Sequence, residues 1–140
     1  MGISNASSTW TGTLKAGKGA MKPANGPEVP FSLGTRFEGQ KGSNPEELLG
    51  AAFTGCYSMA LSAALEGAGI TPEQISTSAK VHLDKDGPGF KISKIELRTE
   101  IRASGADAAK VKAIAEQTHK QCPVGKALSA VETTVEAVLV

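Results

Sequence analysis

Neither sign of charge predominates in this sequence, which carries 15 lysines and arginines against 14 aspartates and glutamates. The formal net charge of +1 gives no reason to expect binding to nucleic acid or to an anionic membrane surface. No uninterrupted apolar run approaches the roughly 20 residues of a membrane span. The first residues also lack the charged and apolar regions of a signal peptide. We therefore expect a cytoplasmic protein with no membrane or nucleic-acid partner.

Cysteine and histidine are scarce as well, with two residues of each: Cys56, Cys122, His82 and His119. Their spacing fits no zinc-site pattern. Both histidines fall on polar faces of their elements and are expected to be solvated, which leaves hydrolase chemistry weakly supported. In a cytoplasmic protein, a pair of cysteines is more often catalytic or redox-active than a permanent disulfide.

What the chain does have is the composition of a globular protein, with 40% hydrophobic and 21% charged residues. Its 140 residues predict a single domain, residues 1–140. The expected elements are strands at 7–15, near Met21 and at 31–33, a long helix within 43–69, strands at 75–83 and 90–101, helices at 107–121 and after Pro123, and a strand at 133–140. A change of phase near Ser93 predicts a β-bulge in the strand at 90–101. Because the strands come mostly in adjacent pairs, we expect an α+β fold with antiparallel sheets around the long helix.

The long helix is the most apolar segment of the chain. Asn44 is a good N-cap and Pro45 suits the first helical position. Apolar residues then recur at three- and four-residue steps and predict one buried stripe: Leu49, Ala52, Phe53, Cys56, Met59, Ala60 and Ala63. Taken alone, a mid-helix cysteine on such a stripe is more often a core residue than a reactive thiol.

The second cysteine lies at a predicted helix break, because Pro123 disfavours helical geometry at the residue before it. We expect Cys122 to be the N-cap of the short last helix, where the thiolate is stabilised and the pKa of the thiol lowered. For this residue alone, a redox role and a structural role are about equally supported. Cys56 and Cys122 both face inward in this interpretation, so they can meet in a shared core and form a reversible disulfide.

Two further residues, Arg36 and Glu47, have no functional role that can be argued from each residue by itself. Taken alone, Arg36 is interpreted as a solvated loop cation. Glu47 stands three residues after Asn44 and is interpreted as its capping partner.

Three blocks of the chain resemble the OsmC/Ohr family, the osmotically induced and organic-hydroperoxide-resistance proteins. Thr35-Arg36-Phe37-Glu38-Gly39, followed by Asn44-Pro45-Glu46-Glu47-Leu48, is similar to the arginine loop and helix start of the family. Residues 51–61, around Cys56, resemble its first-cysteine helix, and Cys122-Pro123-Val124 its second-cysteine motif. The order of elements agrees along essentially the whole chain, and the residues after Arg36 and Pro123 favour the OsmC branch.

The resemblance implies a thiol peroxidase that reduces organic hydroperoxides, and hydrogen peroxide less well. By match of motif, Cys56 is the peroxidatic cysteine and Cys122 the resolving one, Arg36 stabilises the Cys56 thiolate, and Glu47 holds Arg36 in place. Such proteins are intertwined homodimers with the sites at the subunit interface. No metal or cofactor is implied, and the reductant is a dithiol, in this family often a lipoyl group on a carrier protein.

The positions of Glu47 and Cys56 add a constraint to this interpretation. Nine residues of straight helix separate two residues by roughly 13 Å along the axis and turn them to opposite faces. We therefore expect Glu47, and with it Arg36, to act on Cys56 of the partner subunit. The alternative to a peroxidase is a non-catalytic dimeric module that binds a small apolar ligand between its helices.

Overall fold

The computed structural model describes residues 2–140, which form two compact units divided between Leu48 and Leu49. The first unit holds β1 (Ala6–Thr11), β2 (Lys18–Pro23), β3 (Val29–Phe31), α1 (Leu33–Phe37) and the start of α2 (Pro45–Gly67). The second holds the rest of α2, β4 (Gln74–Asp86), β5 (Gly89–Arg102), α3 (Ala108–Thr118), α4 (Pro123–Ala127) and β6 (Glu132–Leu139). The expected α+β class is confirmed.

The first unit is an antiparallel sheet in the order β1-β2-β3, followed by the short helix α1. The rings of Trp10 and Phe31 meet with their centroids 5.5 Å apart. They meet over Gly19, where a Cβ atom would lie 2.7 Å from each ring, so only glycine fits between them. The sequence predicted a strand reaching Leu33 and a loop from residue 35. The structure instead forms α1 there, because Ser32 and Thr35 cap each other's backbone N–H groups.

The sheet of the second unit has the order β4-β5-β6. Strands β4 and β5 form a long antiparallel hairpin, and its register shifts where His82 faces Lys94 and Leu83 faces Ile92. Ser93 is the extra residue, so the predicted bulge is confirmed. Strand β6 runs parallel to β5, which corrects the expectation of purely antiparallel sheets. The reason is that the chain crosses over through α3 and α4 and re-enters the sheet from the same end.

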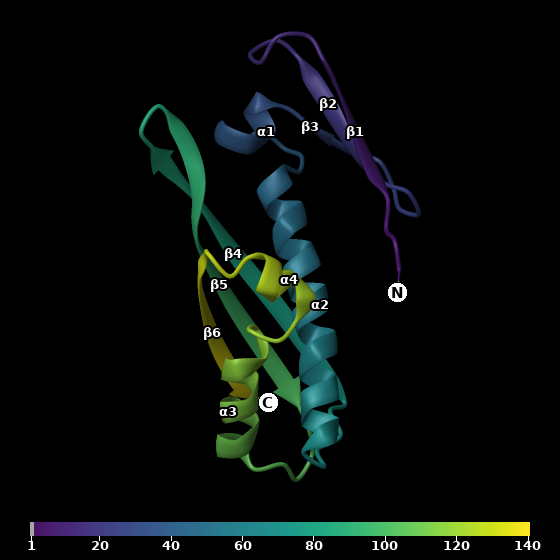
Figure 1. The fold of residues 1–140 in the computed structure, drawn as a ribbon, viewed down its shortest axis with the longest axis vertical. Helices are drawn as coiled ribbons and strands as arrows, with labels where there is room; N and C mark the ends of the chain where they lie inside the picture. Colours follow the sequence, from purple (N-terminus) through teal and green to yellow (C-terminus); the bar gives the residue numbers. More distant parts are fainter. Residues whose placement is uncertain (1) are drawn as a thin grey trace. The chain divides into compact units, whose positions relative to one another are not determined.

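The helices of the second unit lie on one face of this sheet (Figure 1), and the core forms between them and β5. The buried side chains are Phe53, Tyr57, Leu61 and Leu65 of α2, Ile95, Leu97 and Ile101 of β5, Ala103, Val111 and Ala115, and Cys122. Hydrogen bonds also tie α2 to the sheet, since the hydroxyl of Ser58 bonds that of Thr77 at 2.9 Å and Thr77 donates to Thr99 at 3.1 Å.

The buried stripe of α2 matches the predicted one only in part, since Phe53 is buried and Cys56 and Ala60 pack against the core. Its members repeat at every fourth residue from Phe53 to Leu65, whereas Ala52 and Ala63 are exposed and Met59 is 77% exposed. Because α2 is apolar nearly all round, its periodicity does not select a single face. Aromatic and leucine side chains occupy the core, whereas Met59 and most of the alanines of the predicted stripe remain outside.

Among residues 2–140, α2 is long enough and apolar enough to cross a membrane, with 23 residues and a mean hydropathy of 1.5. The sequence analysis had found no apolar run of that length, because glycine, serine and threonine interrupt the segment. A single such helix is weak evidence for a membrane span, since the core helix of a soluble protein passes the same test.

Candidate functional site

The two cysteines come together in the second unit. Cys56 comes from the middle of α2 and is half-buried, and Cys122 is the N-cap of α4 and fully buried. Both are free thiols, and Cys56 packs against the core that contains Cys122, close enough to raise the pKa of the Cys122 thiol. Two cysteines far apart in the sequence thus form a pair that can be joined by a disulfide.

The local sequence explains how Cys122 reaches this position. Pro123 fills the first position of α4, and Cys122 has the extended backbone of an N-cap, with φ −71° and ψ 143°. The N–H of Gly125 donates to Cys122 Sγ at 3.2 Å. A Cβ atom at Gly125 would lie 1.8 Å from the carbonyl oxygen of His119, so the first turn of α4 packs against the end of α3 only because this residue is glycine.

The electrostatic surroundings of Cys122 differ from the prediction. Burial raises the pKa of its thiol, and the hydrogen bond from the Gly125 N–H lowers it only in part. The neighbouring Cys56 raises the pKa further. The expected effect of the helix N-terminus is present, but desolvation outweighs it. Cys122 is therefore a protonated thiol at neutral pH.

Tyr57, which the sequence analysis did not single out, fixes the rotation of α2 beside Cys56. Its hydroxyl donates to the carbonyl oxygen of Ala115 in α3 at 2.8 Å, and its side chain is fully buried. Burial, with smaller contributions from Cys122 and Glu116, raises the pKa of Tyr57 well above its usual value. The phenol therefore remains a neutral donor that holds the two helices together.

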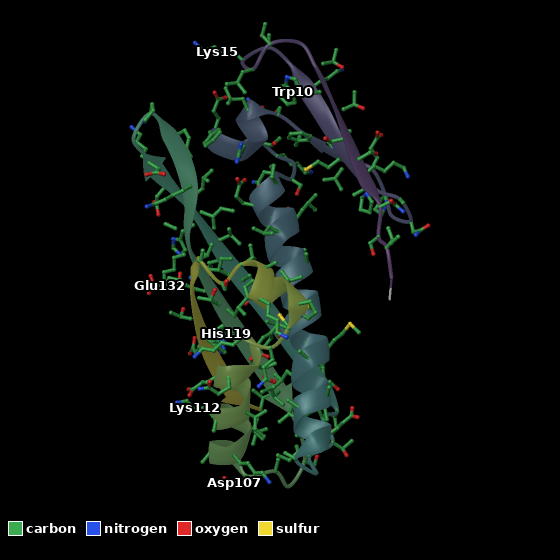
Figure 2. All side chains as sticks on the ribbon, viewed as in Figure 1. Trp10, Lys15, Asp107, Lys112, His119 and Glu132 are labelled. Atoms are coloured by element: carbon green, nitrogen blue, oxygen red, sulfur yellow. The ribbon has the colours of Figure 1, made fainter. Side chains whose placement is uncertain are left out.

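His119 ends α3, next to the start of α4 (Figure 2), and is half-buried rather than solvated as predicted. Its Nδ1 atom is buried and has no hydrogen bond of ordinary geometry within residues 2–140. Burial lowers the pKa of His119; the Glu116 carbonyl offsets this in part, and the charge of Lys120 adds to it. The imidazole is therefore neutral at neutral pH.

This burial predicts a pH dependence of stability. The pKa of His119 lies below its usual 6.5 in the folded chain, so the unfolded chain binds more protons there as the pH falls. The stability associated with neutral His119 is present above the unfolded pKa and is lost on acidification. We expect His119→Asn, which does not titrate, to lose less stability than the wild type between about pH 7 and pH 5. Urea unfolding across this range measures it, and parallel profiles for the two proteins would contradict it.

Arg36 forms a second candidate pair, in the first unit, with Glu46. Its Nε donates to both carboxylate oxygens of Glu46, at 3.0 and 3.1 Å, and its Nη2 also donates to Oε1. The Glu46 side chain is only 10% exposed, and the guanidinium lies 5.2 Å from the centroid of the Phe37 ring. A bidentate contact to a buried carboxylate holds a guanidinium in a fixed orientation.

The prediction that Glu47 holds Arg36 is therefore corrected. The Glu47 side chain is exposed and accepts a hydrogen bond from Ser43 Oγ at 2.9 Å, while its backbone N–H donates to Asn44 Oδ1 at 2.8 Å. Glu46 and Glu47 are adjacent in the first turn of α2 and project in directions about 100° apart. Only Glu46 faces α1, and sequence alone gave no reason to prefer it.

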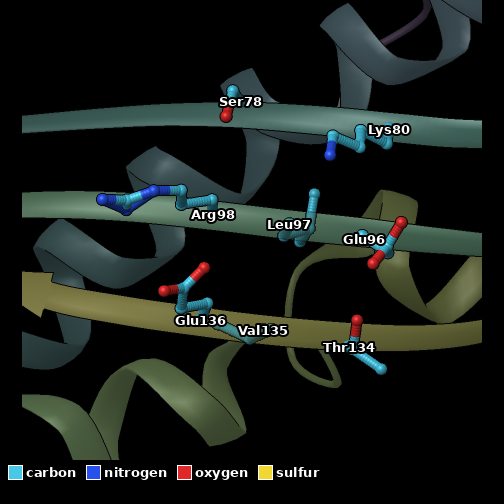
Figure 3. Close-up of a pocket in the computed structure, with 8 residues that line it drawn as sticks. All are labelled: Ser78, Lys80, Glu96, Leu97, Arg98, Thr134, Val135 and Glu136. Atoms are coloured by element: carbon cyan, nitrogen blue, oxygen red, sulfur yellow. The ribbon is translucent and has the colours of Figure 1, made fainter.

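The opposite face of the β4-β5-β6 sheet carries a charged hollow of about 220 Å³ (Figure 3). Its charges balance across the strands, because Lys80 faces Glu96 and Arg98 faces Glu136. His82 Nε2 lies 2.6 Å from Glu96 Oε2, and this contact lowers the pKa of Glu96. No cysteine lines this hollow, so the cysteine pair is not part of it.

Comparisons with known proteins agree with this arrangement. A family model described as OsmC-like protein matches residues 38–136. The chain is 46% identical over 123 residues to peroxiredoxin OsmC of Escherichia coli (strain K12), covering 86% of each protein. It is 24% identical over 99 residues to organic hydroperoxide resistance protein OhrA of Bacillus subtilis (strain 168), covering 69% of this chain and 68% of that protein.

Among solved structures, an organic hydroperoxide resistance protein from Elizabethkingia anophelis superposes with a TM-score of 0.74 at 22% identity. The match covers 99% of each chain and shows that the fold is shared. The family match covers most of the chain, and the identity to the OsmC relative is much higher than the identity to the Ohr relative. This chain therefore belongs to the OsmC-like family, on its OsmC branch.

Proposed function

We propose that this protein is a cysteine-based peroxidase that reduces organic hydroperoxides, and hydrogen peroxide less well, through Cys56 and Cys122. The observation that carries the proposal is the meeting of the two free thiols, since Cys56 packs against the core that holds Cys122 and lies close enough to raise the pKa of its thiol. The relatives named peroxiredoxin and organic hydroperoxide resistance protein support the same activity.

The two cysteines take different roles in this reaction. The Cys56 thiolate attacks one peroxide oxygen and the O–O bond breaks, so the alcohol leaves and a sulfenic acid remains on Cys56. The Cys122 sulfur then attacks the Cys56 sulfur, water leaves, and a disulfide forms. The raised pKa of Cys122 suits the second role, because a protonated thiol does not compete for the peroxide.

We assign to Arg36 the role of stabilising the Cys56 thiolate. Thiolate formation on an apolar helix is unfavourable unless a cation offsets the loss of hydration. Arginine is suited to this because it stays charged when partly buried and can engage two partners. The bidentate contact with Glu46 supports this role, because it fixes the guanidinium while leaving its Nη1 nitrogen without a bond to that carboxylate. Glu46, in place of Glu47, is the positioning residue.

We assign the protein a homodimeric state and a cytoplasmic location, with a dithiol, such as a lipoyl-bearing protein, as reductant. The exposed face of α2 supports the dimer: it carries Ala52, Gly55, Met59 and Ala63, and a Cβ at Gly55 would meet nothing within 4 Å in one chain. An apolar face made mostly of small residues, with Met59 as its one large side chain among these four, allows a second helix to approach closely.

A single-turnover reaction of the reduced protein, analysed by mass spectrometry, tests the function. Cumene hydroperoxide is expected to remove two hydrogens and leave a Cys56–Cys122 bridge, faster than hydrogen peroxide does. If Cys56 remains a thiol in excess peroxide, the peroxidase assignment is wrong. The protein would then be a dimeric module that binds a small apolar ligand between its helices.

A further inference from the structure

A hollow of about 560 Å³ lies on the connection between α3 and β6. Its volume falls within the range of sites that bind small organic molecules, about 300–1,000 Å³. All of its lining residues come from one stretch of the chain, between His119 and Thr133. Neither cysteine and no residue of α2 lines it, so the peroxidase reaction does not account for it.

The lining carries positive charge and no compensating carboxylate. Lys120 follows α3 and Lys126 lies in α4, and both are exposed. Within residues 2–140 neither lysine forms an ion pair. The sequence has no acidic residue between Glu116 and Glu132. Two cations from separate segments of the chain therefore line one hollow with no anion between them.

The two acidic residues that bound this segment are engaged elsewhere. The Glu116 carboxylate lies 3.9 Å from Lys112 Nζ. Glu132 begins β6, and successive side chains of a strand point to opposite faces of the sheet. Because Thr133 lines the hollow, Glu132 points to the other face, where its cross-strand neighbour is Lys94. Neither carboxylate neutralises the two lysines of the hollow, which leaves them to an external anion.

The rest of the lining is largely apolar. Leu128 and Val131 are half-buried, and the methylene stems of the lysines add apolar surface beneath their charges. Ser129 adds an exposed hydroxyl, and His119 adds a half-buried ring. Lysine ammonium groups are point charges without the fixed fork of arginine, so they fit a compact anionic head group. A ligand that matches this lining has an aliphatic chain and one carboxylate.

We propose that this hollow binds an aliphatic carboxylate, whose head group lies between Lys120 and Lys126 and whose chain lies on Leu128 and Val131. The inference goes beyond the proposed peroxidase function and does not depend on it, because no step of that reaction uses these residues. A bound ligand connects the end of α3 to α4, the two helices on either side of Cys122. The hollow is a second ligand site, distinct from the redox pair.

Four small probes that separate charge from chain test the proposal. Hexanoate carries both, hexanol only the chain, acetate only the charge, and hexylammonium the chain with the opposite charge. Each is titrated into the protein at low salt, and binding is followed by NMR chemical shifts. We expect hexanoate to bind on the order of tenfold more tightly than any of the others. Equal affinity for acetate would mean an adventitious ion only, and equal affinity for hexanol or hexylammonium an apolar contact that does not select charge; either result would overturn the proposal.

Variants of the lining test the two parts of the site separately. Lys120→Gln/Lys126→Gln should weaken hexanoate on the order of tenfold and change hexanol by less than about twofold. The matched control, Lys15→Gln/Lys85→Gln, makes the same change of net charge at exposed positions outside the hollow and should keep the affinity of the wild type. Ser129→Trp fills the hollow from an exposed position and should weaken both ligands. Equal weakening by both lysine pairs, or full affinity in Ser129→Trp, would overturn the proposal.

The peroxide site is the alternative location for an alkyl chain, so the same titration has to locate the ligand. We expect hexanoate to shift the methyl signals of Leu128 and Val131 and the ring signals of His119. The rate at which cumene hydroperoxide oxidises Cys56 should stay unchanged at saturating hexanoate. Shifts confined to α2, together with competition against the peroxide, would place the ligand at the redox pair and overturn the proposal. The titration itself needs no peroxide, so a wild type that forms no disulfide would contradict the proposed function alone.

Discussion

Cys56→Ser is expected to reduce peroxide turnover by a factor on the order of 10⁴ to 10⁶, the cost of removing a covalent nucleophile in other enzymes. A serine hydroxyl at this position has no base to activate it, and it forms no sulfenic acid. The measurement is the steady-state reduction of cumene hydroperoxide with a dithiol as electron donor. The fold should persist, because the residue is only half-buried and the exchange is nearly isosteric.

Cys122→Ser is the matched control for this prediction, because it removes the other half of the pair. We expect it to reduce one equivalent of peroxide at the rate of the wild type and to stop at the sulfenic acid. Excess peroxide should then convert Cys56 to the sulfinic acid, which mass spectrometry detects as a gain of two oxygens. If Cys56→Ser retained turnover while Cys122→Ser lost its first reduction, the roles of the two cysteines would be reversed.

The sequence predicted those features of the fold that depend on one local signal. Asn44 and Pro45 mark the start of α2, which is confirmed by the Glu47 N–H that donates to Asn44 Oδ1. The phase change near Ser93 marks the bulge in β5, and Pro123 marks Cys122 as an N-cap. In each case one residue restricts the backbone strongly enough to decide the local structure.

The features that the sequence did not predict depend on tertiary packing. Helix α2 is apolar on most sides, so the choice of Tyr57 over Met59 for the core is made by the sheet and α3. The pKa of Cys122 follows from burial, which is not visible in a local motif. The choice between Glu46 and Glu47 depends on where α1 lies, and the sequence analysis had placed no helix there.

The second large expected effect concerns Arg36 and the glutamate that binds it. Three variants test it. Arg36→Ala is expected to lower kcat/KM for cumene hydroperoxide by about 10² to 10³, as loss of an electrostatic stabiliser does elsewhere. Glu46→Gln should cost roughly ten- to a hundredfold, because the guanidinium loses its bidentate partner. Glu47→Gln is the control and should stay within about twofold, since within residues 2–140 its side chain bonds Ser43 and not Arg36. Equal losses for the two glutamate variants would contradict the assignment of Glu46.

Mixed dimers show whether Arg36 serves Cys56 of its own subunit or of its partner. Along a straight helix, Glu46 and Cys56 are about 15 Å apart along the axis and about 80° apart around it, so the axial separation argued for Glu47, though not the opposite facing, holds for the residue that binds Arg36. We expect two inactive proteins, Arg36→Ala and Cys56→Ser, to regain activity when their subunits are exchanged.

If each site is made by both subunits, every heterodimer has one intact site out of two. Random exchange makes half of the dimers heterodimers, so about a quarter of the wild-type activity should return. If the groups act within one subunit, no site in the mixture is complete and the exchanged protein stays inactive. Activity that rises with exchange time and saturates near a quarter therefore identifies Arg36 as the partner subunit's contribution to the thiolate.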